Sequence, residues 1–369
     1  MRGGELALFE PRPAPRSSAR SAAAPRDNAD PPASGGGIVI VTDAWEPQVN
    51  GAVRTLQAVR AVLERNGHQV HVISSDLFYS LPCPTYPEIR LAITRVASVG
   101  AMLEGLEPMY IHLATEGPLG VAARRWCLQH QFPFTTAYHT HLPDYVATRT
   151  GIPAEWLWRY IRWFHAPSEA ILASTPSVRQ SLIDHGVRHV RHWGRGVDHA
   201  VFRAGVAPHP RIANLPGPVQ LYAGRIAVEK DLPAFLESRH PGTKVVVGDG
   251  PARAELEARY PAAKFLGAMF GEELASAYAA ADVFVFPSRT DTFGLAMIEA
   301  LACGVPVAAF PVSGPIDLVT PETGAMDRDL TRAIGEALTR DRAACIAYGR
   351  SFTWEDSAAQ FLHGLVPIG

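Results

Sequence analysis

Apolar and polar residues follow two patterns along the chain. Short runs of β-branched and aromatic residues predict strands that are buried on both faces, and longer stretches with apolar residues at helical spacing predict amphipathic helices. The two kinds of segment alternate from residue 38 onwards, which predicts parallel sheets covered by helices. The predicted strands are residues 38–42, 68–74, 109–113, 134–138, 171–176, 219–223, 244–247, 265–267, 283–287 and 307–310. The predicted helices are residues 53–66, 121–129, 156–165, 178–185, 253–259, 295–303, 329–338 and 354–362.

The chain has 369 residues, enough for two α/β domains of ordinary size. Its first residues are rich in Pro, Ala, Ser, Arg and Gly and have no apolar period, so we expect them to be disordered. The first strand, helix and strand of the ordered part form a Rossmann-type unit, and the proline-rich stretch 208–218 marks a boundary. The expected division is a disordered extension (1–37), a first Rossmann-like domain (38–200), a second (201–349) and a final helix that crosses back onto the first domain (350–369).

Residues 282–312 carry the clearest candidate for a functional site. A buried strand is followed by a polar loop and then by a helix that a glycine and a proline end. Ligands of open α/β sheets bind at the carboxyl ends of the strands, and a helix N-terminus there favours anions. Asp291 lies in the loop and Glu299 in the first turns of the helix. A carboxylate beside an anion site is unfavourable unless it has a role, such as accepting hydrogen bonds from a sugar diol.

This stretch resembles a known family of enzymes. The pattern Asp291-x7-Glu299, set in the sequence PSRTDTFGLAMIEALACGVPV, resembles the retaining glycosyltransferases of family 4, which have the GT-B fold. The resemblance implies two Rossmann-like domains that face each other across a cleft, with the nucleotide-sugar donor on the second domain and the acceptor on the first. It implies that Glu299 binds the ribose of the donor and that Asp291 binds hydroxyls of the sugar. The resemblance also implies further donor contacts from Phe293, Gly294 and Leu295.

Two cations follow the strand that opens the second domain. Arg225 and Lys230 lie in the sequence AGRIAVEKDL, and in the resembled family these positions hold the donor's diphosphate. The leaving phosphate gains negative charge as the glycosidic bond breaks, and an arginine fork with a compact ammonium group can stabilise that charge in place of a metal ion. Taken alone, the pair would be ordinary solvent-exposed charges. The loop at Met269 matches the place where the family contacts the nucleobase, largely through backbone groups.

The first domain carries weaker candidates at the ends of its strands. The loop that ends at Gly51 resembles the family's first glycine loop, where the donor phosphate approaches the backbone, although a tight turn would also explain it. His139 matches a histidine that contacts the donor sugar near the bond that breaks, so Asp291, Arg225, Lys230 and His139 are the catalytic candidates. Glu116 can hold an acceptor hydroxyl or cap the following helix. The candidates for acceptor contacts are Trp45, Asn50, Glu116, His141 and Asp144.

One helix is aromatic and basic. In the segment WLWRYIRWFH, the side chains of Trp156, Tyr160, Trp163 and Phe164 share one helical face. A buried helix face is the ordinary interpretation. The alternative is an interfacial patch through which the enzyme reaches a lipid acceptor.

Composition excludes several classes. A net charge of −2 gives no support for a nucleic-acid partner. The four cysteines lie far apart, so neither a disulfide framework nor a zinc site is expected, and no apolar run approaches a membrane span. His139 and His141, with Asp144 nearby, do not form a closed metal shell. We therefore expect a metal-independent cytoplasmic protein without a cofactor, with peripheral membrane contact as a possibility.

The branch of the family is suggested by three segments. The sequences TDAWEPQVNGAVRTL, CPTYPEIRLA and PSRTDTFGL resemble the GDP-mannose-dependent α-mannosyltransferases. That resemblance implies transfer of mannose from GDP-mannose to a lipid or glycolipid, with retention at the anomeric carbon. A sulfolipid or glucolipid synthase that uses a UDP-sugar is the close alternative. Outside glycosyl transfer, the alternatives are a nucleotide-sugar 2-epimerase and a non-catalytic nucleotide-sugar-binding protein.

Overall fold

The structure is a computed structural model that describes residues 37–48, 50–83, 86–141, 143 and 153–369. Two six-stranded sheets, each parallel throughout, form the framework of this part of the chain. The expected disorder of residues 1–37 concerns, apart from Gly37, residues outside the described ranges. Every predicted strand and helix corresponds to an element of the structure, although most boundaries differ by one to a few residues.

The first sheet has the strand order β2-β1-β5-β6-β7-β8. Because the chain adds β2 on one side of β1 and β5 on the other, the order reverses between β1 and β5, and ligands of such sheets bind at that reversal. The strands are β1 (Ile38–Thr42), β2 (Val70–Ser74), β5 (Tyr110–Leu113), β6 (Thr135–Tyr138), β7 (Ala170–Ala173) and β8 (Val190–His192). The helices of this half are α1 (Gly51–Arg65), α2 (Val96–Leu106), α3 (Pro118–His130), α5 (Ala154–His165) and α6 (Pro176–Asp184).

Alternating residues of β1 face two separate cores, as expected for a strand buried on both faces. Val39 and Val41 belong to the cluster that packs under α2 and α3, whereas Ile38 and Ile40 belong to the cluster that packs under α1. A further helix, α15 (Trp354–Gly364), lies against α1 and also touches β7 and β8. The last described helix of the chain therefore completes the core of the first sheet.

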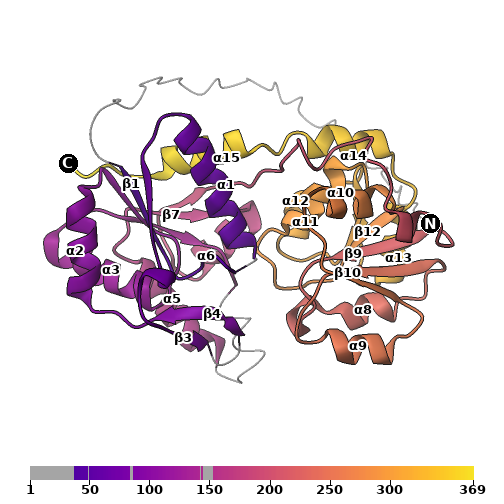
Figure 1. Cartoon of the computed structure of the whole chain (residues 1–369), viewed down its shortest axis with the longest axis horizontal. Coiled ribbons are helices and arrows are strands. Elements are labelled where there is room, and N and C mark those ends of the chain that lie inside the picture. The colour runs from indigo at the N-terminus through magenta and orange to yellow at the C-terminus, as the bar shows by residue number, and fades with distance from the viewer. Residues whose placement is uncertain (1–36, 49, 84–85, 142, 144–152) are drawn as a thin grey trace, which may run out of the picture. The chain divides into compact units, whose positions relative to one another are not determined.

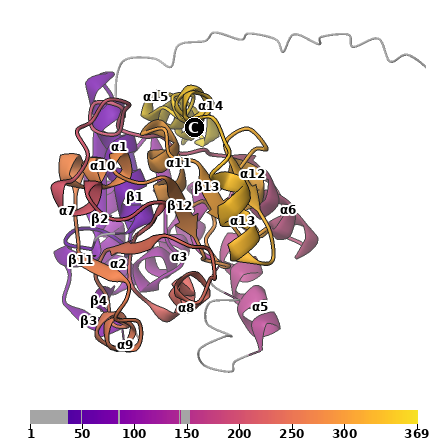
Figure 2. The same ribbon diagram turned by 90° about the vertical axis from the view of Figure 1, so that its right-hand side faces the viewer.

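The second sheet has the order β11-β10-β9-β12-β13-β14, the doubly wound Rossmann arrangement, with its reversal between β9 and β12. Figures 1 and 2 both show α8 and α9 on one side of its strands and α10 and α11 on the other. The strands are β9 (Val219–Ala223), β10 (Thr243–Val247), β11 (Lys264–Gly267), β12 (Val283–Phe286), β13 (Val307–Ala309) and β14 (Gly324–Met326). The helices are α7 (Pro210–Ala213), α8 (Leu232–Leu236), α9 (Arg253–Arg259), α10 (Gly271–Ala279), α11 (Leu295–Ala302), α12 (Pro315–Leu318), α13 (Leu330–Ala337) and α14 (Arg342–Gly349).

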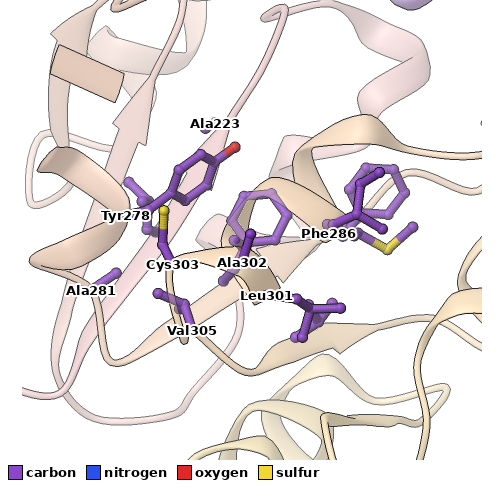
Figure 3. Close-up of a cluster of buried hydrophobic side chains, with 14 of the residues drawn as sticks. Ala223, Tyr278, Ala281, Phe286, Leu301, Ala302, Cys303 and Val305 are labelled. Carbon is purple, nitrogen blue, oxygen red and sulfur yellow. The ribbon is translucent and has the colours of Figure 1, made fainter. Parts of the chain in front are cut away.

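The core between α10, α11 and the second sheet is one continuous cluster of buried apolar residues. Figure 3 shows Tyr278, Phe286 and Leu301 within this cluster, all of them buried. Cys303 lies beside the Tyr278 ring, and its burial raises the thiol pKa to about 12. This packing fixes α11 against β12, so the loop that joins them is held at both ends.

Prolines at alternate positions in residues 82–87 predict a loop, because proline disfavours helices and central strands, but that prediction is wrong for most of these residues. β3 (Ser80–Cys83) and β4 (Tyr86–Ala92) pair as a two-stranded antiparallel ribbon apart from the main sheets. Proline is tolerated there because both strands are edge strands. Some backbone N–H groups of an edge strand form no hydrogen bond to a neighbouring strand, so the N–H that proline lacks is not needed.

The buried face of α5 is not the predicted one. Trp158, Ile161 and Phe164 are buried, whereas Trp156 is 69% exposed and Trp163 is 42% exposed. The buried face is shifted by about one residue along the helix from the expected face, so Trp158 is buried and the rings of Trp156 and Trp163 are left outside. The buried-face interpretation therefore holds for Phe164 but fails for Trp156 and Trp163.

Candidate active site

The loops that follow β9 and β10 touch at their backbones. A Cβ atom at Gly248 would lie 1.9 Å from the carbonyl oxygen of Gly224, so no larger residue fits there. This close approach places Arg225 at the strand end, where Tyr222 donates a hydrogen bond of 2.7 Å to its carbonyl oxygen. A short 3₁₀ turn (Val228–Lys230) then brings Lys230 back toward the sheet. Both predicted cations thus lie at the carboxyl end of β9, beside the reversal in strand order.

Lys230 and Asp291 are brought together from loops on either side of that reversal. The Lys230 ammonium donates to both carboxylate oxygens of Asp291, at 2.6 and 2.8 Å. The two side chains are 22% and 24% exposed, so water is only partly excluded from the pair. The sequence predicted both residues for the site, and the structure adds that each neutralises the other.

Helix α11 begins with an uncapped N-terminus. Gly294, the residue before it, has a φ of 90°, a conformation that favours glycine, and a Cβ there would lie 2.7 Å from Met297 Cε. No side chain in the described part of the chain caps the helix, so its first N–H groups and its dipole can interact with an anion. Phe293 is buried and Leu295 half-buried at this point, where backbone rather than side-chain groups would meet a ligand. Met269, likewise buried, precedes α10.

Glu299 lies one turn further along α11 and is buried. It forms an ion pair with Arg54 of α1 and accepts a hydrogen bond of 3.3 Å from the Tyr278 hydroxyl. Burial next to this carboxylate raises the pKa of Tyr278 well above its usual value, so the hydroxyl stays protonated and donates. Nothing in the sequence indicated the Arg54 contact, which spans 245 residues.

Gly51 is the first residue of α1 rather than part of a loop. Asn50 is the N-cap of this helix, and its side-chain oxygen accepts from the Val53 N–H at 3.0 Å. The helix cap explains the presence of Asn50 without any contact to an acceptor substrate. The Gly51 backbone remains exposed. A Cβ at Gly51 would lie 3.9 Å from Leu295, which sets these two helix starts near each other. Trp45 is partly buried against the core under α1.

Glu116 belongs to a separate polar network at the end of β5. Its carboxylate lies 3.3 Å from His165 Nε2 and does not cap α3, so the capping interpretation is wrong. The group that serves the N-terminus of α3 is Asp43, which accepts from the N–H of Leu119 at 3.0 Å. Burial raises the pKa of the Asp43 carboxyl, although the Leu119 hydrogen bond opposes that shift.

His139 follows β6 and touches both halves of the chain. Its ring lies against Trp193, its Nδ1 is 3.3 Å from Arg195, and its carbonyl oxygen accepts from Thr292 at 2.6 Å. Burial, with the nearby Arg195 charge, holds the pKa of His139 well below its usual value. His141 Nε2 lies 3.4 Å from the Ser313 hydroxyl. Asp144, the remaining acceptor candidate, lies outside the described residues.

Comparison with known proteins covers both halves of the chain. Residues 49–201 match the family model described as Glycosyltransferase Family 4, and residues 217–340 match the one described as Glycosyl transferases group 1. A GDP-mannose-dependent alpha-mannosyltransferase of Mycobacterium tuberculosis is 32% identical over 314 residues, which are 77% of this chain and 81% of the relative. The chain belongs to glycosyltransferase family 4. It is a glycosyltransferase, and its nucleotide-sugar donor is the substrate class that the family implies.

The names of other similar proteins refer to different sugars. The sulfoquinovosyl transferase of Arabidopsis thaliana is 30% identical over 65% of this chain and 50% of its own length. Among solved structures, a sucrose-phosphate synthase from Thermosynechococcus elongatus has a TM-score of 0.72 at 22% identity, covering 89% of this chain and 98% of its own. The Anabaena HepE protein in complex with UDP and glucose has a TM-score of 0.66 at 17% identity, covering 89% and 99%. These structures establish the GT-B fold of the glycosyltransferase.

Two arginines that contact the predicted site residues of the glycosyltransferase were not foreseen. Arg54 meets Glu299, and Arg195 meets His139. Arg195 is buried, which its sequence position near the expected domain boundary at residue 200 did not indicate. Among the described residues, no group of three or more His, Cys, Asp or Glu side chains is placed to hold a metal ion.

Proposed function

We propose that this glycosyltransferase moves mannose from GDP-mannose to a hydroxyl of a lipid or glycolipid. The observation that carries the proposal is the 32% identity to GDP-mannose-dependent alpha-mannosyltransferases across both halves of the chain. A Corynebacterium glutamicum relative of the same name is also 32% identical, over 76% of this chain.

In this proposal the donor binds to the second half. Arg225 and Lys230 hold the diphosphate together with the uncapped N-terminus of α11. Glu299 accepts hydrogen bonds from the ribose, and Asp291 accepts them from the sugar. The backbone around Phe293, Gly294 and Leu295 supplies further contacts to the sugar, and the backbone at Met269 contacts the base. Support comes from the Lys230–Asp291 pair, which shows that these two loops reach the same place.

The chemistry is substitution with retention on one face of the sugar. The acceptor hydroxyl attacks the anomeric carbon on the side from which the phosphate leaves, and the departing phosphate oxygen takes the hydroxyl proton. Lys230 and Arg225 stabilise the charge that grows on the phosphate, which makes a metal ion unnecessary. His139 lies beside the sugar and donates a hydrogen bond near the bond that breaks. Closure of the two halves around the donor keeps water from hydrolysing it.

The acceptor binds to the first half in this scheme. Gly51 and the start of α1 lie near Leu295, so a molecule at this point would meet both halves. Trp45 and Glu116 follow β1 and β5, the strands that flank the reversal in the first sheet. Asn50 is a weaker candidate because its side-chain oxygen is engaged as a helix cap. We place the first domain at residues 38–200 and the donor domain at residues 201–349.

An exposed aromatic patch on α5 supports contact with a lipid surface. Trp156 and Trp163 are exposed, and the exposed Arg159 lies on the same helix. Tryptophan and arginine together suit the boundary between lipid headgroups and acyl chains. We infer that α5 holds the enzyme at the membrane where its acceptor resides. No helix among the described residues is both long and apolar enough to cross a membrane.

A UDP-sugar donor is the second candidate. It is favoured by the similarity to the Arabidopsis sulfoquinovosyl transferase and to an alpha-monoglucosyldiacylglycerol synthase of Streptococcus pneumoniae, which is 26% identical over 82% of this chain. Backbone groups at Met269 could contact either guanine or uracil, so an experiment has to decide between GDP-mannose and a UDP-sugar as the donor.

Thermal unfolding with GDP and with UDP tests the donor. A nucleotide at about 100 times its dissociation constant adds about 2.7 kcal/mol to the free energy of unfolding, which is a readily measured shift. We expect GDP to stabilise the protein and UDP to have little effect. Stabilisation by UDP alone would replace GDP-mannose with a UDP-sugar, and no response to either nucleotide would contradict the donor site itself.

A further inference from the structure

Arg195 is a buried arginine whose side chain reaches a proposed catalytic residue. It is 6% exposed and lies just after β8, within the first half of the chain. One of its terminal nitrogens donates to the carbonyl oxygens of Trp193, at 2.6 Å, and Gly194, at 3.0 Å. The other lies 3.3 Å from His139 Nδ1. Its guanidinium also stacks on the Trp193 ring, 4.4 Å from the ring centre, so four contacts hold it in place.

The direction of the hydrogen bond to His139 follows from chemistry. Arginine has only donors, so His139 Nδ1 must be the acceptor and carries no proton. A neutral imidazole in this position therefore carries its proton on Nε2. The ring is held from a second side by Trp193, whose indole lies edge-on at 5.4 Å between ring centres. His139 Nε2 is buried and has no hydrogen-bond partner among the described residues.

We propose that Arg195 is a positioning residue that keeps His139 neutral, with its proton on Nε2, so that the imidazole presents one fixed N–H to the donor sugar. A buried N–H without a partner is costly, and a ligand oxygen that accepts from it recovers that cost. Without this hydrogen bond the proton could also lie on Nδ1, and a ring in that tautomer has no N–H to donate from Nε2. The inference rests on the proposed place of His139 beside the sugar, but its first test does not require transfer activity.

The charges around His139 agree with this assignment. The groups that face its ring are Arg195 and His112 of β5, and no carboxylate is among them in the described part of the chain. Burial lowers the pKa of His112 to about 3, so that ring is neutral near pH 7. Burial lowers the pKa of Arg195 to about 9, which leaves it cationic at the same pH. A proton on His139 Nδ1 would therefore meet a cation and no compensating anion.

The tautomer of His139 can be read directly by NMR. Histidine labelled with ¹⁵N in the intact protein gives long-range ¹H–¹⁵N spectra in which protonated and bare ring nitrogens are distinct, and the His139→Gln variant assigns the signal. We expect a bare Nδ1 and a protonated Nε2 at pH 7, with the ring remaining neutral well below pH 6.5. A proton on Nδ1, or a cationic ring at pH 7, would overturn the proposal whether or not the protein transfers mannose.

Two substitutions of Arg195 separate the hydrogen bond from the charge. Arg195→Met removes both, whereas Arg195→Gln can still donate to Nδ1. We expect Arg195→Met to mix the tautomers and to lower kcat about tenfold or more, with the KM for the donor changed less than about threefold. Arg195→Gln should restore the tautomer and part of kcat. Arg188→Met, which changes an exposed arginine in the turn before β8, is the matched control.

The pH profile gives an additional readout that a purely structural role would not move. In Arg195→Met the acid limb of kcat/KM should shift to higher pH, because loss of the cation makes His139 easier to protonate. If the methionine variant does not fold, judged by its thermal unfolding, Arg195→Gln carries the test. An unchanged tautomer and an unchanged acid limb in Arg195→Met would refute the assignment of Arg195. In Arg195→Gln, which keeps the hydrogen bond but lacks the charge, an unchanged acid limb alone would refute it.

Discussion

Lys230 and Asp291 form a direct ion pair with each other. The ammonium lies within 2.8 Å of both carboxylate oxygens, so the proposed phosphate-binding cation and the proposed sugar-binding anion form one neutral unit. A donor that places phosphate and sugar hydroxyls here would exchange this ion pair for two charge-assisted interactions. The pair therefore joins the loops that follow β9 and β12, and each charge is compensated by the other.

Replacing Lys230 with alanine should impair turnover more than donor binding. If Lys230 stabilises charge that appears only as the phosphate leaves, kcat falls about 100-fold while the dissociation constant of the donor rises less than about tenfold. Single-turnover kinetics and calorimetry measure the two quantities. Lys264→Ala, which removes an exposed lysine at the start of β11, should change neither. A normal kcat in Lys230→Ala would remove Lys230 from the mechanism.

Glu299→Gln should weaken nucleotide binding by about tenfold, because a neutral amide is a poorer acceptor for two ribose hydroxyls. Glu299 also pairs with Arg54, so loss of that pair has to be separated from loss of the ribose contact. Arg54→Gln breaks the same pair and keeps the carboxylate. We expect calorimetry to show weak nucleotide binding in Glu299→Gln and undiminished binding in Arg54→Gln. Equal losses in both variants would assign the effect to the ion pair instead.

His112 should make stability depend on pH. Burial lowers its pKa to about 3 from 6.5, so the unfolded chain binds one more proton than the folded protein between these values. The free energy of unfolding therefore falls as the pH falls through this window, by at most about 1.4 kcal/mol per pH unit. Urea unfolding at pH 7 and pH 5 should show a shallower dependence in His112→Gln than in the native protein. The exposed His363→Gln should keep the native slope, and equal slopes in all three proteins would contradict the prediction.

Transfer activity should survive EDTA. Arg225 and Lys230 supply the positive charge at the proposed leaving phosphate, so a divalent cation has no required place in the proposed mechanism. The measurement compares initial rates in EDTA, in magnesium and in manganese after the protein has been passed through a chelating resin. Complete loss of activity in EDTA, restored by one of the metals, would mean that the two side chains are not sufficient.

Trp156 and Trp163 should contribute to binding at lipid surfaces. Replacing both with serine removes the exposed aromatic area of α5 while leaving its buried face intact. Sedimentation with vesicles of phosphatidylcholine and phosphatidylglycerol in equal parts should show about tenfold weaker binding. Leu128→Ser, at an exposed apolar residue of α3, serves as control. Native binding by the double variant would place any membrane contact elsewhere.

The sequence predicted the framework well because both sheets are buried on two faces. Short apolar runs such as residues 38–42 and 283–286 are typical of central strands, and both form fully buried strands. The loops that follow such strands contain the donor-binding candidates. The helix between Gly294 and Gly304 was bounded by glycines, which the structure places at positive φ. Strand β8 and helix α2 are among the elements that were not predicted. β8 is only three residues long, and α2 lacks a strong apolar stripe.

What the sequence did not reveal depends on contacts between distant residues. The periodicity of α5 allows more than one apolar face, and only packing against Tyr138 and His185 selects Trp158 for burial. Arg195 was not among the predicted site residues, since its contact with His139 joins residues 56 positions apart. Likewise, Glu116 could cap α3 by sequence, but Asp43 reaches the same N-terminus from β1. Local patterns leave such choices open.

Helix α15 has a consequence for how the protein is made. Its Phe361 packs with Leu56 of α1 in one core, and Arg65 pairs at 2.8 Å with Glu355, 290 residues further along the chain. During synthesis, a chain that has emerged only as far as β8 therefore lacks part of its own interior, and the half translated second can complete its core first. If the gene were divided between the two halves, α15 would be part of the second fragment although it packs against the first. Two such fragments produced together should find each other, with α15 as the piece that joins them.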